Sequence, residues 1–397
     1  MKKKQEELLE QLLKQIGSAE DFYEVKEALF KRGVESLLKA ELSAHLKSET
    51  GEEKEKNIRN GYSEKTLHTS SGSHTIKVPR DRQSTFDPVI VPKHKTMARE
   101  IEDCILLLYA KGMSTSDIVD FLQSTYGVKY STSQISIITD RLLEDIRQWQ
   151  QRPLEDKYAI VWIDAIHYKI RKDGKVISKA AMIVLGVDLT GRQDILSVYI
   201  VEKETAASWM SILDDLKMRG VQDILFLCSD NLNGLTKAVE QAFPQSIHQI
   251  CIVHQIRNSI KFVSYKDRKQ IIKQIKEIYK SANIEQAQMA LANFKEQWGE
   301  KYTAVIKSWE RNWDHLTVFL NYPAEIRKLI YTTNIIESFN ASLRKYTKNK
   351  KIFPTDDAAL KSIYLAAQQI KAKWQKGRFN WHNVYNQLYM HFENRIT

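Results

Sequence analysis

One stretch near the end of the chain places a carboxylate and several cations at helical spacing. Residues 331–351 read YTTNIIESFNASLRKYTKNKK. Apolar side chains recur there every three or four residues, which predicts a helix with one buried stripe: Ile336, Phe339, Leu343 and Tyr346. Glu337, Arg344 and Lys348 share a second face, and Lys350 and Lys351 follow just beyond it. A carboxylate beside cations on one face could hold a metal ion and a phosphate backbone together.

Two aspartates upstream could join this carboxylate. Asp164 lies in a β-rich run at residues 158–168, and Asp230 directly follows a short apolar run at residues 223–228. The pattern between and after them predicts, in order, strands at 176–189 and 195–201, a helix at 205–219, the strand at 223–228, a helix at 232–243 and a strand at 247–253. This order is typical of a mixed α/β sheet in which the first and fourth strands can be neighbours. Both aspartates would then lie near one edge, where Glu337 can complete the cluster.

Three converging carboxylates have a recognisable chemistry. Without compensating cations they would repel one another, which raises their pKa values. Mg²⁺ resolves the conflict because it prefers oxygen ligands and keeps water and substrate phosphate in its shell. Two such ions about 3.5–4 Å apart, with Mn²⁺ as a substitute, can activate a water or a 3′-hydroxyl and stabilise the leaving oxygen of an in-line displacement. That chemistry cuts and joins phosphodiesters.

Each acidic residue also has a purely structural interpretation. Asp164 could simply end its strand, and Asp230 with Asn231 could form a turn or cap the helix that begins near Leu232. Glu337 could be the reciprocal carboxylate of a capping box begun by Asn334. Residue types and spacing leave these alternatives open.

A Cys-x-x-His pair lies between the second aspartate and the glutamate. Cys251 and His254 supply only half of a structural zinc site, and no second pair follows them. We therefore expect both side chains to pack or hydrogen-bond near the carboxylates. His254 either orients a carboxylate or the scissile phosphate, or has a buried structural role. Arg257 follows on the same segment.

Composition and charge limit the class of protein. The 397 residues carry a net charge of +11, and 43% of them are apolar, which suggests two to four folded domains. A pI near 9.2 is typical of proteins that bind nucleic acid or an anionic membrane surface, although it also suits a solubilising surface. Three widely spaced cysteines indicate a reducing compartment. The longest apolar run, residues 180–187, is too short to span a bilayer, and the N-terminus does not resemble a signal peptide, so we expect a cytoplasmic protein with no membrane contact.

The first 95 residues predict helices and a hairpin. Residues 1–50 show two helical stripes, one at Leu9–Ile16 and one at Val34–Leu42, and residues 51–61 look like a linker. A hairpin is predicted over residues 66–78, with Ser71-Gly72 at its turn. Arg80 and Arg82 in the following PRDR motif could grip phosphates or lie in a solvated loop.

Residues 97–149 have the rhythm of three helices. The first stops at Gly112, Ser114 can cap the second, and Gly127 ends it. Ser131 and Gln134 form a capping box for the third. This is a helix-turn-helix pattern, in which Ser133, Gln134 and Ser136 would face base edges, or else an ordinary three-helix packing unit.

The motifs together resemble a known family. The chain is similar to the bacterial insertion-sequence transposases related to the eukaryotic Mutator elements, which use two aspartates and one glutamate. The matching segments are RNG at 59–61, VPRDR at 78–82, LYAKGMSTSDI at 108–118, WQQRPL at 149–154, IDAIHYKIR around Asp164, CSDNLNGL around Asp230, QICIVHQIRNS around Cys251 and His254, and YTTNIIESFN around Glu337. The family's basic residue seven positions after the glutamate corresponds to Arg344. Asn231 stands where many relatives have glycine.

The resemblance implies a fold and a division of the chain. It implies an α/β, ribonuclease-H-like mixed sheet with an all-helical insertion, preceded by helical N-terminal and helix-turn-helix DNA-binding domains. The expected parts are an N-terminal helical and hairpin DNA-binding region at 1–95, the helix-turn-helix at 96–150, the first part of the catalytic core at 151–254, the insertion at 255–328, and the final part of the core with C-terminal helices at 329–397. An aromatic residue of the insertion can stack on a distorted base, for which Trp313 is the candidate, although Trp309 is close and a packing role is an alternative.

The resemblance also implies an activity. We expect a DNA transposase that binds the terminal inverted repeats of its insertion sequence. Asp164, Asp230 and Glu337 would be the catalytic residues and hold Mg²⁺, supported by Cys251, His254 and Arg344. Hydrolysis at the end of the element frees a 3′-hydroxyl, which attacks target or flanking double-stranded DNA. The residues expected to contact DNA are Arg80, Arg82, Ser133, Gln134, Ser136, Arg257, Trp313, Arg344 and Lys348. Synapsis of two ends implies a homodimer associated with the bacterial nucleoid. A regulator that binds but does not cut, and a structure-specific nuclease, are the alternatives.

Overall fold

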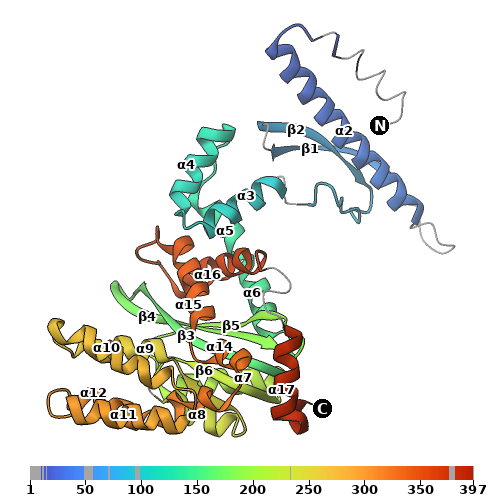
Figure 1. Ribbon diagram of the computed structural model, residues 1–397. Helices are drawn as coiled ribbons and strands as arrows, with labels where there is room; N and C mark the ends of the chain where they lie inside the picture. Colours follow the sequence, from blue (N-terminus) through green and yellow to red (C-terminus); the bar gives the residue numbers. More distant parts are fainter. Residues whose placement is uncertain are drawn as a thin grey trace. The chain divides into compact units, whose positions relative to one another are not determined.

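The chain forms two compact units. The computed structural model describes residues 10, 13–14, 16–48, 57–69, 72–93, 99–232, 234–374 and 381–396 (Figure 1). Residues 1–109 and 114–138 make up the smaller unit, and residues 110–113 and 139–397 make up the larger one. Among the described helices, none combines the length and the hydrophobicity that crossing a bilayer requires.

A long helix and a hairpin form the first part of the smaller unit. Helix α2 spans Ala19–Ser48, and strands β1 (Arg59–Thr69) and β2 (Gly72–Asp81) pair antiparallel from Thr69↔Gly72 outward. Leu38 of α2 is buried with Leu67 and Ile76 of the hairpin, whereas Leu37 is 54% exposed. The predicted hairpin is therefore confirmed, while its turn residue Ser71, residues 51–56 and most of the first predicted helix lie outside the described residues.

The linker predicted at 51–61 is wrong for its last three residues. Arg59 already belongs to β1 and pairs with Asp81 of β2. The reason is tertiary, because the Asp81 carboxylate is buried and accepts hydrogen bonds from Asn57 Nδ2 (2.8 Å) and from the Thr85 backbone N–H (2.9 Å). These bonds hold the start of β1 against the end of β2.

Local capping signals define the helices that follow. Their bounds are α3 Arg99–Ala110, α4 Thr115–Tyr126, α5 Thr132–Asp140 and α6 Leu142–Gln151. Ser114 caps α4 in a capping box with Asp117, and Gly127 ends that helix with φ +66°. The predicted reciprocal bonds between Ser131 and Gln134 are present at the start of α5. The long third helix is divided into α5 and α6 at Arg141, whose backbone angles remain helical.

The larger unit is built on a five-stranded mixed sheet. Its strands are β3 Lys157–Lys172, β4 Lys175–Asp188, β5 Gln193–Val201, β6 Asp223–Ser229 and β7 Ile247–Ile250, in the order β5-β4-β3-β6-β7. Strands β3, β4 and β5 are antiparallel, whereas β6 pairs parallel to both β3 and β7. The predicted mixed α/β sheet and the pairing of its first and fourth strands are confirmed. β7 is shorter than predicted, because Ile252 already begins a helix.

Helices cover both faces of this sheet (Figure 1). Along β4, Met182 and Val184 face one side with α7 (Ala206–Met218) and α8 (Leu235–Ala242), while Ile183 and Leu185 face the other. That other face is covered by α15 (Asn334–Thr347) and α16 (Asp356–Lys371). Burial on both faces explains the nearly continuous apolar sequence of the strands.

The helical run predicted at 255–330 is present, although it already begins at Ile252. The elements are α9 Ile252–Lys261, α10 Tyr265–Tyr279, α11 Ile284–Trp298, α12 Thr303–Arg311, α13 Trp313–Leu316, the 3₁₀ helix η1 Val318–Asn321 and α14 Ala324–Ile330. Their apolar core is continuous with one face of the sheet. Trp309 is fully buried there and donates its indole N–H to Ser259 Oγ (3.0 Å). The segment is therefore packed as part of the larger unit.

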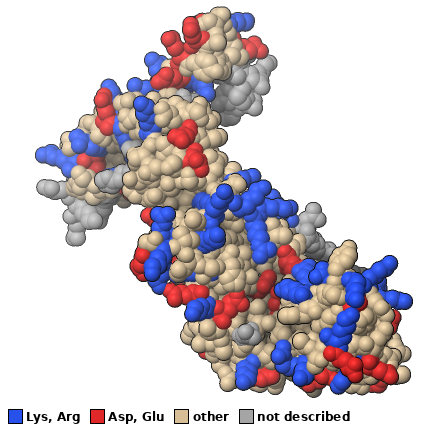
Figure 2. All heavy atoms as spheres, turned by 90° about the vertical axis from the view of Figure 1, so that its left-hand side faces the viewer, with Lys and Arg blue, Asp and Glu red and all other residues tan. Residues whose placement is uncertain are grey.

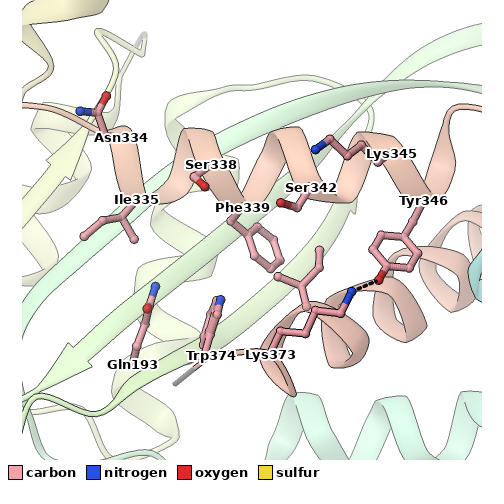
Figure 3. A pocket seen from close by; sticks show the side chains of 11 residues that line it. Gln193, Asn334, Ile335, Ser338, Phe339, Ser342, Lys345, Tyr346, Lys373 and Trp374 are labelled. Carbon is pink, nitrogen blue, oxygen red and sulfur yellow. Dashed lines mark hydrogen bonds between the residues drawn. The ribbon is translucent and has the colours of Figure 1, made fainter. Parts of the chain in front are cut away.

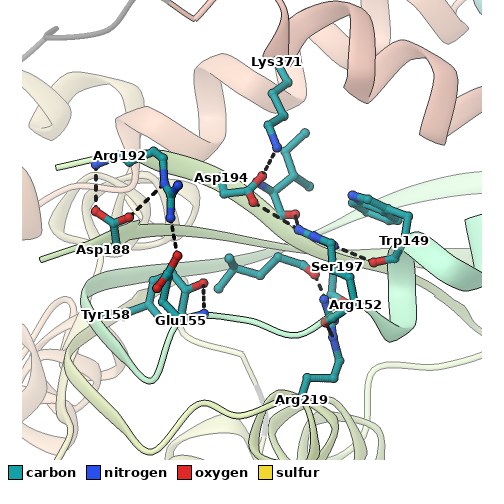
Figure 4. Close-up of polar contacts among 12 residues, drawn as sticks. Trp149, Arg152, Glu155, Tyr158, Asp188, Arg192, Asp194, Ser197, Arg219 and Lys371 are labelled. Carbon is teal, nitrogen blue, oxygen red and sulfur yellow. Dashed lines mark hydrogen bonds and ion pairs between the residues drawn. The ribbon is translucent and has the colours of Figure 1, made fainter. Parts of the chain in front are cut away.

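The linker into the sheet is fixed by two arginines (Figure 4). Arg152, which follows α6, donates to the carbonyl oxygens of Trp149 (2.7 Å) and Ile195 (2.6 Å) and to Asp194 Oδ2 (3.2 Å). Arg219 in turn donates to the carbonyl oxygen of Arg152 (2.9 Å). The WQQRPL segment thus attaches the end of α6 to the edge strand β5.

The last helix closes against the turn between β4 and β5. Helix α17 spans Trp381–Ile396, and the Trp381 indole N–H donates to the carbonyl oxygen of Leu189 (2.8 Å). Gly191 in that turn has φ +84°, and a Cβ there would lie 2.4 Å from the Trp381 ring. Both facts require glycine at this position.

Gln249 provides a test of how the helical segment is joined to the sheet. Its buried amide donates to the carbonyl oxygen of Leu316 (3.0 Å) and accepts from the Phe319 N–H (2.9 Å). Gln249→Leu leaves both groups buried without a partner, so we expect a loss of about 2–4 kcal/mol in the free energy of unfolding. Urea unfolding followed by tryptophan fluorescence measures it, because all eight tryptophans belong to the larger unit.

The control for this prediction is Gln222→Leu, which changes an exposed glutamine of the same unit. We expect it to leave the urea midpoint unchanged. An equal effect of both substitutions would contradict the account of Gln249.

Candidate active site

Strand pairing and one helix bring the three acidic residues to one cavity. Ile163 of β3 pairs with Ser229 of β6, so Asp164 and Asp230 are the next residues on two parallel neighbours. Glu337 lies in the first turn of α15, which packs on β3. A cavity of about 310 Å³ is lined by these three residues together with Ala165, His254, Arg257, Asn340 and Arg344.

Asp164 is held by two hydrogen bonds at the base of this cavity. Its Oδ1 accepts from the Ala165 backbone N–H (2.8 Å), and its Oδ2 accepts from Asn340 Nδ2 (2.5 Å). Burial, and secondly the charge of Asp230, raise the pKa of Asp164 to about 6 despite these bonds. Without a bound cation, the carboxyl group is therefore partly protonated near neutral pH.

His254 bridges the other two carboxylates. Its Nδ1 lies 2.6 Å from Asp230 Oδ1, and its Nε2 lies 3.2 Å from Glu337 Oε1. Burial lowers the pKa of His254, but hydrogen bonds to Asp230 and Cys251 outweigh burial and raise the pKa to about 10. Each ring nitrogen of His254 thus faces one carboxylate oxygen, and Arg257 Nη1 also lies 3.2 Å from Nε2, so His254 links Asp230 with Glu337.

Glu337 faces cations and does not cap its helix. Arg257 Nη1 donates to Glu337 Oε1 at 2.6 Å. Helix α15 begins without a side-chain cap, so the capping-box interpretation of Glu337 is wrong. The helix-cap interpretation of Asp230 is also wrong, because α8 begins at Leu235 after Gly234 without a side-chain cap, whereas the Asp230 carbonyl oxygen does accept a local turn bond from the Leu232 N–H (2.8 Å).

Cys251 supports the site through Thr333, which in turn contacts Asp230. It is buried at the start of α9, and its Sγ accepts from the Thr333 backbone N–H (3.4 Å). The Thr333 hydroxyl donates to Asp230 Oδ1 (3.3 Å). Ligand atoms of Asp230, Cys251 and His254 lie within 4.8 Å of one another and could also hold one ion, but in the structure hydrogen bonds occupy them.

The donor set of the cavity fits a hard divalent cation. The three carboxylates offer oxygen ligands, which Mg²⁺ prefers. Asp230 Oδ2 and Glu337 Oε2 make no hydrogen bond to any residue that the structure describes, so both oxygens are available. Burial, and secondly the charge of Asp230, raise the pKa of Asp164, and a bound cation would favour its charged form.

The other residues of the larger unit that were predicted to contact DNA lie partly at the cavity and partly away from it. Arg344 lines the cavity, and Arg257 reaches Glu337 directly. Lys348 is exposed at the end of α15 and does not line the cavity. Trp313 is half-buried against the apolar core and is also absent from the cavity lining.

The predicted residues of the smaller unit are mostly exposed. Arg80 in β2 and Arg82 in the turn after it are exposed on either side of the buried Asp81. Ser133 is exposed, whereas Gln134 uses its Oε1 to accept the Ser131 N–H (2.8 Å). Ser136 donates its hydroxyl to the carbonyl oxygen of Thr132 (3.0 Å).

Sequence reasoning missed Asn340 and Thr333. Asn340 lies three residues after Glu337 on α15, so helical spacing could have placed it beside the carboxylate. It is 2% exposed, and its Oδ1 has no hydrogen-bond partner among the described residues. Thr333 contacts both Cys251 and Asp230, which no local pattern indicates.

A second cavity lies on the neighbouring face of α15 (Figure 3). Its volume is about 520 Å³, and Ser338, Ser342, Lys345 and Trp374 are among its lining residues. Lys373 Nζ donates to the Tyr346 hydroxyl there (3.2 Å). Although this cavity is larger, no carboxylate lines it, so it lacks the ligands that the smaller cavity offers.

The contact between Asn340 and Asp164 leads to a pH prediction. The Asn340 hydrogen bond favours the charged carboxylate and lowers the pKa of Asp164. Asn340→Leu removes it, so the pKa of Asp164 should rise above about 6 in the metal-free protein. Carboxyl ¹³C NMR over a pH series measures this pKa, with Ser338→Ala on the other face of α15 as the control. A fall or no change in the Asn340 variant would contradict the assignment.

Comparison with known proteins matches almost the whole length of the chain. The family model described as "Transposase, Mutator family" matches residues 1–377. The chain is 40% identical over 99% of both sequences to a probable transposase for an ISRM3-like insertion sequence element of Sinorhizobium fredii, and 39% identical over the same shares to the transposase for ISRM3 of Rhizobium meliloti. The transposase for IS905 of Lactococcus lactis is 33% identical over 88% of this chain and 89% of its own. Among solved structures, the catalytic core domain of the HTLV-2 integrase, in complex with magnesium, aligns with 33% of this chain and 91% of its own at 15% identity, but a TM-score of 0.18 carries no argument about the fold.

Proposed function

The chain belongs to the Mutator family of transposases, and we propose that it cuts and joins the ends of its element with divalent cations held by Asp164, Asp230 and Glu337. Its relatives are named as transposases of insertion sequences, and the chain is accordingly a DNA transposase. The observation that carries the proposed mechanism is the convergence of these carboxylates on one cavity that also contains Arg257 and Arg344.

The proposed chemistry is hydrolysis followed by strand transfer. When bound, Mg²⁺, or Mn²⁺ in its place, would activate a water or a 3′-hydroxyl for in-line attack on phosphorus and stabilise the leaving oxygen. Water adds to the scissile phosphate at the element end, and the bond to the 3′-oxygen breaks, which leaves a 3′-hydroxyl. That hydroxyl then attacks a phosphate of target or flanking DNA and displaces its 3′-oxygen.

The residues of the cavity have distinct roles in this scheme. Asn340 and the Ala165 N–H orient Asp164, while His254 and Thr333 orient Asp230. Arg257 neutralises Glu337 in the metal-free protein and would turn to a DNA phosphate when cations bind the carboxylate. Arg344, which lines the cavity, would hold a second phosphate, and the exposed Lys348, directly after α15, would contact DNA.

We propose that the sheet is ribonuclease-H-like. Three antiparallel strands followed by two parallel ones, with the acidic residues on β3 and after β6, support this assignment. Residues 151–254 and 329–397 would form the catalytic core, and residues 255–328 its insertion. Two copies of the chain would hold the two element ends.

We also propose that residues 1–95 and the helix-turn-helix at 96–150 bind the terminal inverted repeats. The exposed guanidiniums of Arg80 and Arg82 suit phosphate contacts, and Ser133, Gln134 and Ser136 at the start of α5 suit base edges. Trp313 remains a candidate for base stacking, although only its exposed part could take that role.

Glu337→Gln tests the proposed mechanism. It preserves the shape of the side chain but removes the charge that a cation requires, so cleavage of labelled element-end DNA with Mg²⁺ should fall at least about a hundredfold. Binding of the same DNA without metal should persist. Strand transfer is measured in the same reaction on a gel.

Glu325→Gln, on the exposed surface of α14, is the matched control and should retain full activity. Unchanged cleavage by Glu337→Gln would exclude its proposed role. Binding without any cleavage by the unmodified protein would indicate a regulator, and cleavage of branched DNA without strand transfer would indicate a nuclease.

A further inference from the structure

Helix α10 presents a row of lysines on its outer face. They recur at steps of three and four residues, and all are exposed: Lys266, Lys269, Lys273, Lys276 and Lys280. We call these five residues the lysine row. From Lys266 to Lys280 it covers 14 helical steps, or about 21 Å at the rise of an α-helix. The buried side chains Ile271, Ile275 and Ile278 lie on the opposite face of the helix.

No member of the lysine row has an ionic partner among the residues that the structure describes. None of its members forms an ion pair or a side-chain hydrogen bond with another described residue, whereas the nearby Lys295 pairs with Glu310 and Lys301 with Asp267. The acidic residues of α10 are Asp267 and Glu277, and the Asp267 carboxylate is engaged by Lys301 and Tyr302. Glu277 is the one acidic residue of α10 beside the row, four residues after Lys273 and three before Lys280, so positive charges outnumber negative ones five to one on this face of the helix.

Two exposed aromatic rings stand where the row begins. Phe262 and Tyr265, at the corner between α9 and α10, are 69% and 87% exposed. Exposed rings beside cations are found on surfaces that bind nucleic acid, where bases stack on the rings. Charge and aromatic exposure therefore favour the same class of ligand.

The lysine row starts close to the carboxylate cavity. Helix α9 carries His254 and Arg257 into the cavity and Lys261 at its last turn, one turn beyond Arg257. Four helical steps and a short corner limit the path from Arg257 to Lys266 to roughly 25 Å. Lys and Arg gather in the lower part of the face shown in Figure 2, the side on which α10 lies in Figure 1.

We propose that the lysine row binds the phosphate backbone of the DNA duplex that extends from the scissile phosphate on one side. This inference rests on the proposed function and adds a second DNA-binding surface to it. A length of about 21 Å corresponds to about six base pairs at about 3.4 Å each. Because phosphates carry no sequence information, this surface would bind DNA irrespective of sequence and hold the strand in register with the carboxylates.

The test compares three variants of the full chain. Lys269→Gln, Lys273→Gln and Lys276→Gln together remove three charges of the row. Lys269→Arg, Lys273→Arg and Lys276→Arg keep them. Lys217→Gln, Lys237→Gln and Lys328→Gln remove three charges from exposed positions elsewhere in the larger unit, so net charge is matched.

Affinity is measured by fluorescence anisotropy with a labelled mixed-sequence duplex in EDTA over a series of salt concentrations. Each lost phosphate contact reduces the slope of log K against log salt by about 0.9, so the row variant should lose about 2.7 in slope and bind about tenfold or more weakly. The arginine variant should bind like the unmodified protein, and the scattered variant should change little. Thermal unfolding followed by circular dichroism verifies that each variant is folded.

Equal slopes for the row and scattered variants would overturn the proposal, and so would weak binding by the arginine variant. The one-sided placement is tested with element-end duplexes shortened on either side of the cleavage site. Compared with the unmodified protein, the row variant should bind more weakly to only one of the two shortened duplexes. An equal loss of affinity for both duplexes would overturn the one-sided placement. Since the first assay needs neither metal nor cleavage, its outcome is independent of whether Glu337→Gln abolishes cleavage.

Discussion

The electrostatic repulsion between two neighbouring carboxylates is the constraint on which the site depends. Parallel pairing of β3 with β6 fixes Asp164 and Asp230 next to each other, and burial raises the pKa of Asp164 to about 6. The chain offsets this repulsion with His254 between Asp230 and Glu337 and with Arg257 on Glu337. A site that needs two cationic side chains in the absence of metal is suited to release them when a divalent ion binds.

Those compensating cations come from α9, which connects the sheet to the helical segment. Cys251, directly before α9, contacts Thr333, directly before α15. Gln249 on β7 forms hydrogen bonds with Leu316 and Phe319 near the end of the helical segment. The helical segment between Asp230 and Glu337 is thereby attached to the sheet near both of its ends. Its apolar core is continuous with the core on one face of the sheet. Helix α10 packs on α11 and α9, and the cavity and the lysine row lie in the same compact unit.

Local signals were predictable from the sequence, and long-range contacts were not. The caps of α4 at Ser114 and Gly127 depend on neighbouring residues, and the adjacency of β3 and β6 follows from the order of elements. The contact of Arg257 with Glu337 joins residues 80 positions apart, and that of Asn340 with Asp164 joins residues 176 apart. Periodicity contains no information on such pairs. For the same reason spacing left the capping-box role of Glu337 open, and the start of β1 at Arg59, which depends on Asp81 and Asn57, was missed.

The central claim is that Asp164, Asp230 and Glu337 together hold a divalent cation. Anomalous diffraction from crystals of the full chain soaked in Mn²⁺ tests it most directly. The account predicts an anomalous peak within bonding distance of Asp164 and Asp230 oxygens, with Glu337 turned toward the metal and Arg257 displaced from it. A peak confined to Cys251 and His254, or no peak in this cavity at saturating Mn²⁺, would contradict the account.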